Sequence, residues 1–553
     1  MYYLQEKQDK EILGERVKIL NSKSNIIKYI FIIIIAILII VTSISFYKEK
    51  KEEQNKEALD HTSNFTNIQR DIRLSITEFD NINPLLSGNR NVQEISKVIF
   101  EPLVTFDSTY KMQYCLAREI AKTSDTTYLI QLREDVKFHD GTTFDSNDVK
   151  FTIDTILGKG ISIYRENLKF VSGLNLIDDY TLTLSLSQPV DFFEYNLTFP
   201  IMSSEFYNGE DFVTSAKNNA PVGTGMFKID LAEEKNIRLE KNDDYWNIKN
   251  RDAMIEKIYI NKYGSIGEAY TAFKNGELDI MNIKIQNIED YIGSLGYKKI
   301  QYKGRDYTFL NFNTMHGDIN TNPRVREAIS FAIDKNFIIA NVLGGAYGVA
   351  NYPTDFGSWS FSGSSDQKYN LDVARQLLEA DGWNLKNGNW QKNINGRNTN
   401  LFINLTVNRD NGTIVNVAKN IRDQLGNFGI VVNIKALAGN KYNEAINNRA
   451  YEAAIITIRN SYSPNVNTFL GEGNLANYNN DEVKSILNEI KNSKDENFLN
   501  EKFNRLYQIY ETEAPFIGLY RNINCVVCHQ SLVGNITPNA YNIYHNIEKW
   551  YRQ

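Results

Sequence analysis

The sequence predicts an α/β protein with more than one folded lobe, preceded by one membrane-spanning helix. The chain has 553 residues, whereas a single hydrophobic core stops growing at roughly 250–300 residues. Helical and strand patterns alternate late in the chain, which is typical of an α/β lobe. An apolar run near the start approaches the ~20 residues that are needed to cross a bilayer.

The apolar run reads YIFIIIIAILIIV from Tyr29, and we place the membrane anchor at residues 29–47. A cleaved signal peptide is the alternative, but it would have a short basic start, whereas the preceding run is long and of mixed charge. Its cleavage site would be Ser43-Ile44-Ser45, which is a poor one. We therefore expect an uncleaved single-pass anchor in the cell membrane, with residues 1–28 as a short cytoplasmic segment. Residues 48–69 are charged and polar and form an extracellular tether that spans roughly 25 Å.

Composition and motifs exclude several classes of protein. The chain carries 61 Lys and Arg against 67 Asp and Glu, a formal charge of −6 without basic blocks, which argues against a nucleic-acid binder. Three cysteines are too few for a disulfide scaffold, and five scattered histidines form no zinc set. There is no nucleophile motif, H-E-x-x-H or Walker sequence, so we expect neither an enzyme nor a bound metal, although nickel, a ligand of the family described below, stays open.

Local patterns predict several elements of the lobes. Asp178-Asp179-Tyr180 supplies a turn before the second of two alternating strands. Asn and Asp residues predict where the helices begin, and Gly residues predict where they end. In chain order, we expect strands at 128–132 and 181–186, a helix from near Asn147, a helix over 370–380 ending at Gly382, a helix over 416–428 ending at Gly429, and a strand over 430–434.

The run Cys525-Val526-Val527-Cys528-His529 matches the pattern of c-type haem attachment. The flanking residues 515–520 and 524–527 have the pattern of strands. Residues three apart in a strand face opposite sides, whereas haem attachment needs both thiols on one side. We therefore expect no haem and no other cofactor, and we interpret the cysteine pair as a coincidence.

Several short motifs occur in a fixed order between about residues 70 and 530. They are F-H-D-G-T at 138–142 with D-S-N-D-V-K-F at 145–151, P-V-G-T-G-M-F at 221–227, N-D-D-Y-W at 242–246, F-K-N-G-E-L-D at 273–279, L-N-F-N at 310–313, R-V-R-E-A-I at 324–329 with A-I-D-K at 332–335, and A-R-Q-L-L-E-A-D-G-W at 374–383. Together they resemble the family-5 extracellular solute-binding proteins, the dipeptide, oligopeptide and nickel receptors of ABC importers. Ser146, Met226 and Asp381 depart from the residues that are common in the family.

The resemblance implies a two-lobed fold like that of type II periplasmic binding proteins, with a hinge and an extra domain, closing over a ligand. By analogy, lobe I combines residues 70–112, 222–310 and 516–553, the extra domain is 113–221, and lobe II is 311–515. Most of the motifs have structural readings.

Asp140-Gly141 reads as a tight turn. Gly223-Thr224-Gly225 lets two backbones pass closely. Arg324 or Arg326, behind Pro323, can reach a carboxylate or a carbonyl group.

In peptide-binding relatives, strand edges pair with the main chain of the ligand, and an aspartate commonly holds the peptide α-ammonium group. The resemblance places Tyr462 at the position of that aspartate and Arg459 near the tryptophan of the same motif, with Asn460 beside it. A tyrosine hydroxyl carries no charge at pH 7, and a buried ammonium group without a counter-charge costs several kcal/mol. Four ligands stay open: a blocked peptide, a mid-chain segment, an anionic solute, or a peptide that is held by another acid.

Four further residues are candidate ligand contacts. Asn89, Asn91 and Gln93 precede a strand that we expect at 99–103, and family members use this segment to pair with the ligand backbone. Trp359 lies on a loop rich in glycine and serine, where it either walls the cleft or packs inside the lobe.

These features predict a membrane-tethered, monomeric substrate-binding component of an ABC importer. It would capture an oligopeptide or a related small solute outside the cell and deliver it to permease and ATPase subunits. The alternative is an extracellular sensor that presents its ligand to a signalling partner. The ~28 residues before the helix are too few for a cytoplasmic signalling domain of its own, and neighbouring genes would separate the two functions.

Overall fold

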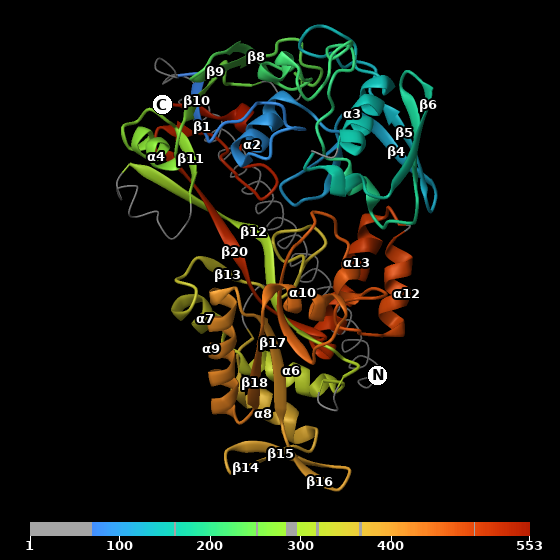
Figure 1. Ribbon diagram of the computed structural model, residues 1–553, viewed down its shortest axis with the longest axis vertical. Helices are drawn as coiled ribbons and strands as arrows, with labels where there is room; N and C mark the ends of the chain where they lie inside the picture. Colours follow the sequence, from blue (N-terminus) through green and yellow to red (C-terminus); the bar gives the residue numbers. More distant parts are fainter. Residues whose placement is uncertain are drawn as a thin grey trace, which may run out of the picture. The chain divides into compact units, whose positions relative to one another are not determined.

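The computed structural model describes residues 69–159, 162–249, 253–283, 296–316, 320–363, 368–491 and 493–553. Within these ranges no helix combines the length and the apolar content that a bilayer crossing requires. The anchor predicted at 29–47 lies outside the described residues. Residues Arg70–Arg552 form one compact unit, and the α/β character predicted for it is confirmed (Figure 1).

A four-stranded sheet in the order β1-β10-β9-β8 begins the first core. Strands β1 and β10 are parallel, and the other pairs are antiparallel. Alternate residues Ile72, Leu74 and Ile76 of β1 are fully buried, as the period of two in a strand requires. The strands are β1 (Asp71–Thr77), β8 (Phe227–Ala232), β9 (Asn236–Lys241) and β10 (Lys257–Tyr263), with helices α2 (Arg90–Ile99) and α4 (Ile266–Lys274).

A second four-stranded sheet, in the order β4-β5-β7-β6, lies within the predicted extra domain. Its elements are β4 (Ala117–Ser124), β5 (Thr127–Leu132), β6 (Val171–Asp178), β7 (Thr181–Leu186) and helix α3 (Ser146–Lys159). The predicted strands at 128–132 and 181–186 and the helix near Asn147 are therefore confirmed. Side chains of this sheet join the same hydrophobic cluster as those of β1. The boundaries 113–221 stay a prediction.

Two long antiparallel strands, β12 (Tyr297–Phe312) and β20 (Phe516–His529), run side by side from the first core into the second (Figure 1). They are the centre of a seven-stranded sheet in the order β11-β20-β12-β19-β17-β18, with β13 added on β20. Their register shifts between Lys303 and Tyr307. The two strands predicted at 515–520 and 524–527 are thus one strand. The remaining strands are β11 (Ile280–Ile283), β13 (Tyr347–Val349), β17 (Phe402–Asn408), β18 (Val431–Leu437) and β19 (Ala453–Arg459).

Hydrophobic side chains pack on both faces of this sheet, and together they form the second core. Alternate residues of β12 point to opposite faces, so the strand contributes to both sides. Leu310 and Phe312 pack with α6, α8 and α9, whereas Tyr307 and Phe309 pack with α12 and α13. The helices are α6 (Pro323–Ala332), α7 (Lys335–Asn341), α8 (Leu371–Ala380), α9 (Gly412–Phe428), α10 (Gly439–Asn447), α11 (Asn467–Leu470), α12 (Asp481–Ile490) and α13 (Glu496–Glu513).

Among the described residues, three small sheets lie outside the three larger ones. They comprise β14 (Asn384–Lys386) with β15 (Asn389–Ile394) and β16 (Arg397–Asn400), β2 (Val104–Phe106) with β3 (Met112–Tyr114), and β21 (Leu532–Val533) with β22 (Tyr551–Arg552).

Helix α8 matches the predicted helix, with Asn370 as its cap. Helix α9 ends at Gly429, as predicted, in the left-handed conformation (φ 98°). It begins four residues earlier than Asn416 because the Asn411 side chain caps it.

The strand expected at 99–103 is wrong. Ile99 is the last residue of helix α2, and the next strand begins at Val104. Val92, Ile95 and Ile99 are buried at helical spacing, and the Asn89 side chain caps the helix by accepting hydrogen bonds from two backbone N–H groups. Pro102 has no N–H group for a strand ladder.

The structural readings of three motifs are confirmed. Gly141 has φ 91° in its turn. An added Cβ atom on Gly223 would lie 2.1 Å from the Ile99 carbonyl oxygen, so the backbones pass as closely as expected. The Arg326 guanidinium donates hydrogen bonds to the carbonyl oxygens of Glu513 and Ala514 at 2.6–3.1 Å.

The cysteine pair lies in β20, as predicted. Cys525 packs with the helix α4 side of the sheet, and Cys528 packs into the first core on the other side. Both thiols are buried and free. The two sulfur atoms therefore face opposite sides of the strand, and burial raises the pKa of each thiol to about 11. This geometry does not fit haem attachment.

Candidate functional site

The side chains of Asn89, Asn91 and Gln93 each form hydrogen bonds within the protein. Asn89 caps α2 and its Nδ2 donates to the Thr77 carbonyl oxygen at 2.7 Å, while Asn91 Oδ1 accepts from the Thr77 N–H group at 3.3 Å. Gln93 Nε2 donates to two carbonyl groups of the preceding loop at 2.7 Å each, and its Oε1 accepts from the Tyr164 hydroxyl at 2.6 Å. These three side chains fix the start of α2. A role in ligand binding stays a prediction.

Trp359 ties its loop to the first core. Its backbone N–H group donates to the Thr109 carbonyl oxygen at 2.9 Å, and its indole Nε1 donates to the Tyr195 hydroxyl at 3.2 Å. The ring stands edge-on to Phe503, with 5.7 Å between ring centroids. Trp359 therefore packs at the junction of the two cores, and contact with a ligand stays a prediction.

Tyr462 lies in an aromatic cluster at the same junction. We define the aromatic cluster as Phe106, Tyr110, Tyr462 and Tyr541, whose rings lie 4.9–5.6 Å apart between centroids in contacting pairs. The Tyr462 hydroxyl donates to the Ala540 carbonyl oxygen at 2.5 Å. Burial raises the pKa of this hydroxyl, so it stays neutral.

Arg305 stacks on the ring of Tyr462, with 3.9 Å from its guanidinium carbon to the ring centroid. Such a cation–π contact is worth about 0.5–2 kcal/mol, depending on desolvation. Its Nη1 donates to the Asn460 carbonyl oxygen at 2.8 Å, and its buried Nε has no hydrogen-bond partner among the described residues. Burial lowers the pKa of Arg305. The aromatic cluster therefore carries a partly buried positive charge.

A polar cavity of about 320 Å³ lies beside this cluster. We define it by its three lining segments: residues 190–196 of the predicted extra domain, Pro353 and Thr354, and the β19–α11 segment from Ile458 to Phe469. It includes the predicted residues Arg459 and Asn460. Tyr462 is not part of its lining.

Two buried side-chain atoms of the polar cavity, Thr354 Oγ1 and Asn460 Oδ1, have no hydrogen-bond partner among the described residues. An unpartnered buried polar atom typically costs about 1–3 kcal/mol. Most buried polar atoms in native proteins are hydrogen-bonded, so an unpartnered one calls for an explanation, such as a water molecule or a functional role. The two atoms mark hydrogen-bonding capacity in the lining that no described residue uses.

The sequence analysis did not identify Asp191 and Thr354 in the polar cavity or Arg305 beside the aromatic cluster. Asp191 stands between Val190 and Phe192, and Arg305 interrupts a strand beside Gly304. A charged residue within an apolar or strand-forming stretch is the signal that could have drawn attention to both.

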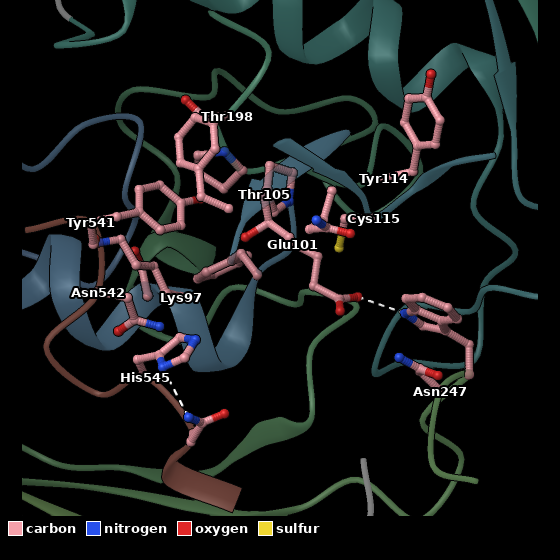
Figure 2. A pocket seen from close by; sticks show the side chains of 18 of the residues that line it. Lys97, Glu101, Thr105, Tyr114, Cys115, Thr198, Asn247, Tyr541, Asn542 and His545 are labelled. Carbon is pink, nitrogen blue, oxygen red and sulfur yellow. Dashed lines mark hydrogen bonds between the residues drawn. The ribbon is translucent and has the colours of Figure 1, made fainter. Parts of the chain in front are cut away.

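A second cavity of about 310 Å³ lies beside α2, and we call it the α2 cavity (Figure 2). Its acid, Glu101, accepts a hydrogen bond from Trp246 Nε1 at 2.8 Å (Figure 2). Glu101 also accepts hydrogen bonds from the Tyr245 hydroxyl at 2.8 Å and from Thr224 Oγ1 at 3.0 Å. Lys97 pairs with Glu94 at 2.9 Å. The charged groups of the α2 cavity are thus engaged within the protein, whereas the polar cavity presents unpartnered atoms.

Comparisons with known proteins agree with this architecture. The family model described as bacterial extracellular solute-binding proteins, family 5 middle, matches residues 111–480, which is more than half of the chain. The oligopeptide-binding protein AppA of Bacillus subtilis is 22% identical over 497 residues, covering 86% of this chain and 90% of AppA. Heme-binding protein A of Haemophilus influenzae is 24% identical over 460 residues, covering 76% of this chain and 81% of that protein.

The crystal structure of a nickel ABC transporter protein from Bacillus halodurans has the same fold. It superposes with a TM-score of 0.71 at 20% sequence identity, covering 87% of this chain and 100% of that chain. The predicted resemblance is confirmed: the chain belongs to the family-5 bacterial extracellular solute-binding proteins, the substrate receptors of ABC importers.

Proposed function

We propose that this protein is a membrane-tethered receptor that captures an oligopeptide outside the cell and delivers it to an ABC permease. The polar cavity carries the proposal. Its lining is rich in uncharged hydrogen-bonding side chains such as Asn460, Ser461, Ser463 and Asn465. Such groups suit the alternating N–H and C=O groups of a peptide main chain.

The place of the cavity supports capture by closure. Segments of both cores meet there, and further contacts across the junction join Tyr462 to Ala540 and Asn467 to Asp191. A ligand bound between the cores touches both sides in the closed form and one side in the open form. It therefore favours closure, because a ligand shifts an equilibrium only by its difference in affinity for the two states.

The relatives support a peptide as the ligand but leave alternatives to test. AppA is an oligopeptide-binding protein, whereas the protein from Haemophilus influenzae binds heme by its name. The many amide and hydroxyl side chains of the lining favour the peptide, because they can pair with main-chain N–H and C=O groups.

The proposed anchor at 29–47 and tether at 48–69 would hold the receptor near its permease. Tethering raises the effective concentration of the receptor without any new contact.

Titration of the full chain in detergent with a degenerate library of synthetic pentapeptides tests the proposed function. Haem and a nickel–histidine mixture serve as comparison ligands. We expect saturable binding of the peptides at micromolar concentration or below, accompanied by a change in tryptophan fluorescence as the cores close. Binding of haem or nickel without binding of the peptides would contradict the proposal.

A further inference from the structure

A peptide with a free amino terminus brings a positive charge that its receptor must neutralise, because an ionised group is not buried without a partner. Tyr462 cannot supply that charge: its hydroxyl is neutral, donates to Ala540 and lies outside the polar cavity. The negative charge in the lining belongs to Asp191. It comes from the predicted extra domain rather than from the β19–α11 segment.

The backbone holds Asp191 toward the β19–α11 segment. The next residue, Phe192, has φ 56° and ψ 38°, a left-handed conformation that is uncommon for a bulky side chain. This bend lets Phe193 and Tyr195 enter the core while Asp191 faces the cavity. Asp191 Oδ2 accepts a hydrogen bond from Asn467 Nδ2 at 2.8 Å, which fixes the carboxylate.

The carboxylate keeps capacity for a ligand. Asp191 forms no ion pair with any described residue, and its Oδ1 atom accepts no hydrogen bond from them. Thr354 Oγ1 and Asn460 Oδ1 line the same cavity, buried and without partners among the described residues. An ammonium group has three N–H donors, and a carboxylate, a hydroxyl and an amide oxygen are three acceptors for them.

Arg459 supplies the opposite charge in the same lining. It forms no ion pair with the described residues, although Asp306 is its cross-strand neighbour. A guanidinium donates to carbonyl and carboxylate oxygens. The lining thus suits a group in which a positive nitrogen and a carbonyl oxygen stand close together, as they do at the amino end of a peptide.

We propose that Asp191 binds the α-ammonium group of the ligand, with Thr354 and Asn460 as the other acceptors, and that the receptor therefore selects peptides with free amino termini. This inference rests on the proposed peptide-binding function. It moves the charge-neutralising role from lobe II, where Tyr462 stands, to the extra domain.

The test compares two forms of one pentapeptide library, with free and with N-acetylated amino termini, on the full chain in detergent. The wild-type protein should bind the free form about tenfold to a hundredfold more tightly, which corresponds to a charge-assisted hydrogen bond. Asp191→Asn should lose most of this preference. It keeps the side-chain shape and an oxygen that can accept from Asn467.

Asp154→Asn is the matched control, because Asp154 is exposed on α3 and pairs with Lys150. It removes the same charge from the same region and should keep the full preference. Asp191→Glu should restore part of it. The affinities for the free and the N-acetylated library are compared within one variant. A loss of folded protein lowers the apparent binding of both libraries equally and leaves the ratio of the affinities unchanged.

Two results would overturn the inference while leaving peptide binding intact. One is equal affinity of the wild-type protein for both library forms, and the other is an unchanged preference in Asp191→Asn. Failure of the wild-type protein to bind either form would instead refute the proposed function, and the inference with it.

Discussion

Asp355→Asn should destabilise the protein strongly, because it leaves the Arg521 guanidinium buried without a counter-charge. Both side chains are 0% exposed, and two guanidinium nitrogens of Arg521 lie 2.5 and 3.1 Å from Asp355 Oδ1. Breaking such a buried pair costs about 3–5 kcal/mol. Arg521 keeps hydrogen bonds to the carbonyl oxygens of Gly304, Tyr352 and Pro353, so we expect a loss near the lower end, about 3 kcal/mol.

Urea unfolding, followed by tryptophan fluorescence, measures the free energy of unfolding. The double variant Asp355→Asn with Arg521→Gln removes the unpaired charge as well and should recover part of the loss, since contacting residues do not act additively. If Asp355→Asn lowers the free energy of unfolding by less than about 1 kcal/mol, the reasoning is refuted, because a solvent-exposed ion pair contributes that little. A double variant that is less stable than both single variants combined would refute it as well.

Three further outcomes are expected. Gly223→Ala should lower the free energy of unfolding by about 1–3 kcal/mol, because its Cβ atom would meet the Ile99 carbonyl oxygen, whereas Gly173→Ala, with no atom within 4 Å of the new Cβ, should cost nothing in the same urea assay. Burial lowers the pKa of His139 to about 4, so between pH 6.5 and 4 the unfolded chain binds a proton that the folded chain does not. Acidification over this range should therefore lower the free energy of unfolding by up to about 3 kcal/mol. His139→Asn should remove this part of the pH dependence. If the free energy of unfolding falls with pH at the same slope in both proteins, the expectation is contradicted. Deletion of residues 1–69 should leave peptide affinity unchanged but abolish uptake by cells, and uptake that persists would refute the tether.

Local patterns predicted much of the fold. The period of two in the strand at 181–186 and the asparagine cap at Asn370 are properties of neighbouring residues, and both were confirmed. The opposite faces of Cys525 and Cys528 also follow from local geometry. The motif order predicted the family, which no local pattern contains and which the family model confirms. The lobe boundaries stay a prediction.

The end of α2 differs from the expectation, because the strand predicted at 99–103 begins where the helix still continues to Ile99. The cap at Asn89 and the helical spacing of Val92, Ile95 and Ile99 are the local signals that favour a helix here.

The candidate site could be predicted only in part. Arg459 and Asn460, which lie near the expected binding motif, line the polar cavity, and their contact with a ligand stays a prediction. Asp191 could not be placed there, because its contact with Asn467 joins positions 276 residues apart. The sequence shows that Tyr462 is not an acid. Which other residue brings a negative charge to the cavity depends on how distant segments of the chain meet.

Native mass spectrometry of the full chain, purified in detergent from cells grown in a peptide-rich medium, tests the central claim most directly. The account predicts a heterogeneous ladder of co-purifying peptide masses that disappears on denaturation, with free amino termini on sequencing. A single non-peptide mass, such as haem or a metal complex, would contradict the assignment of this protein as an oligopeptide receptor.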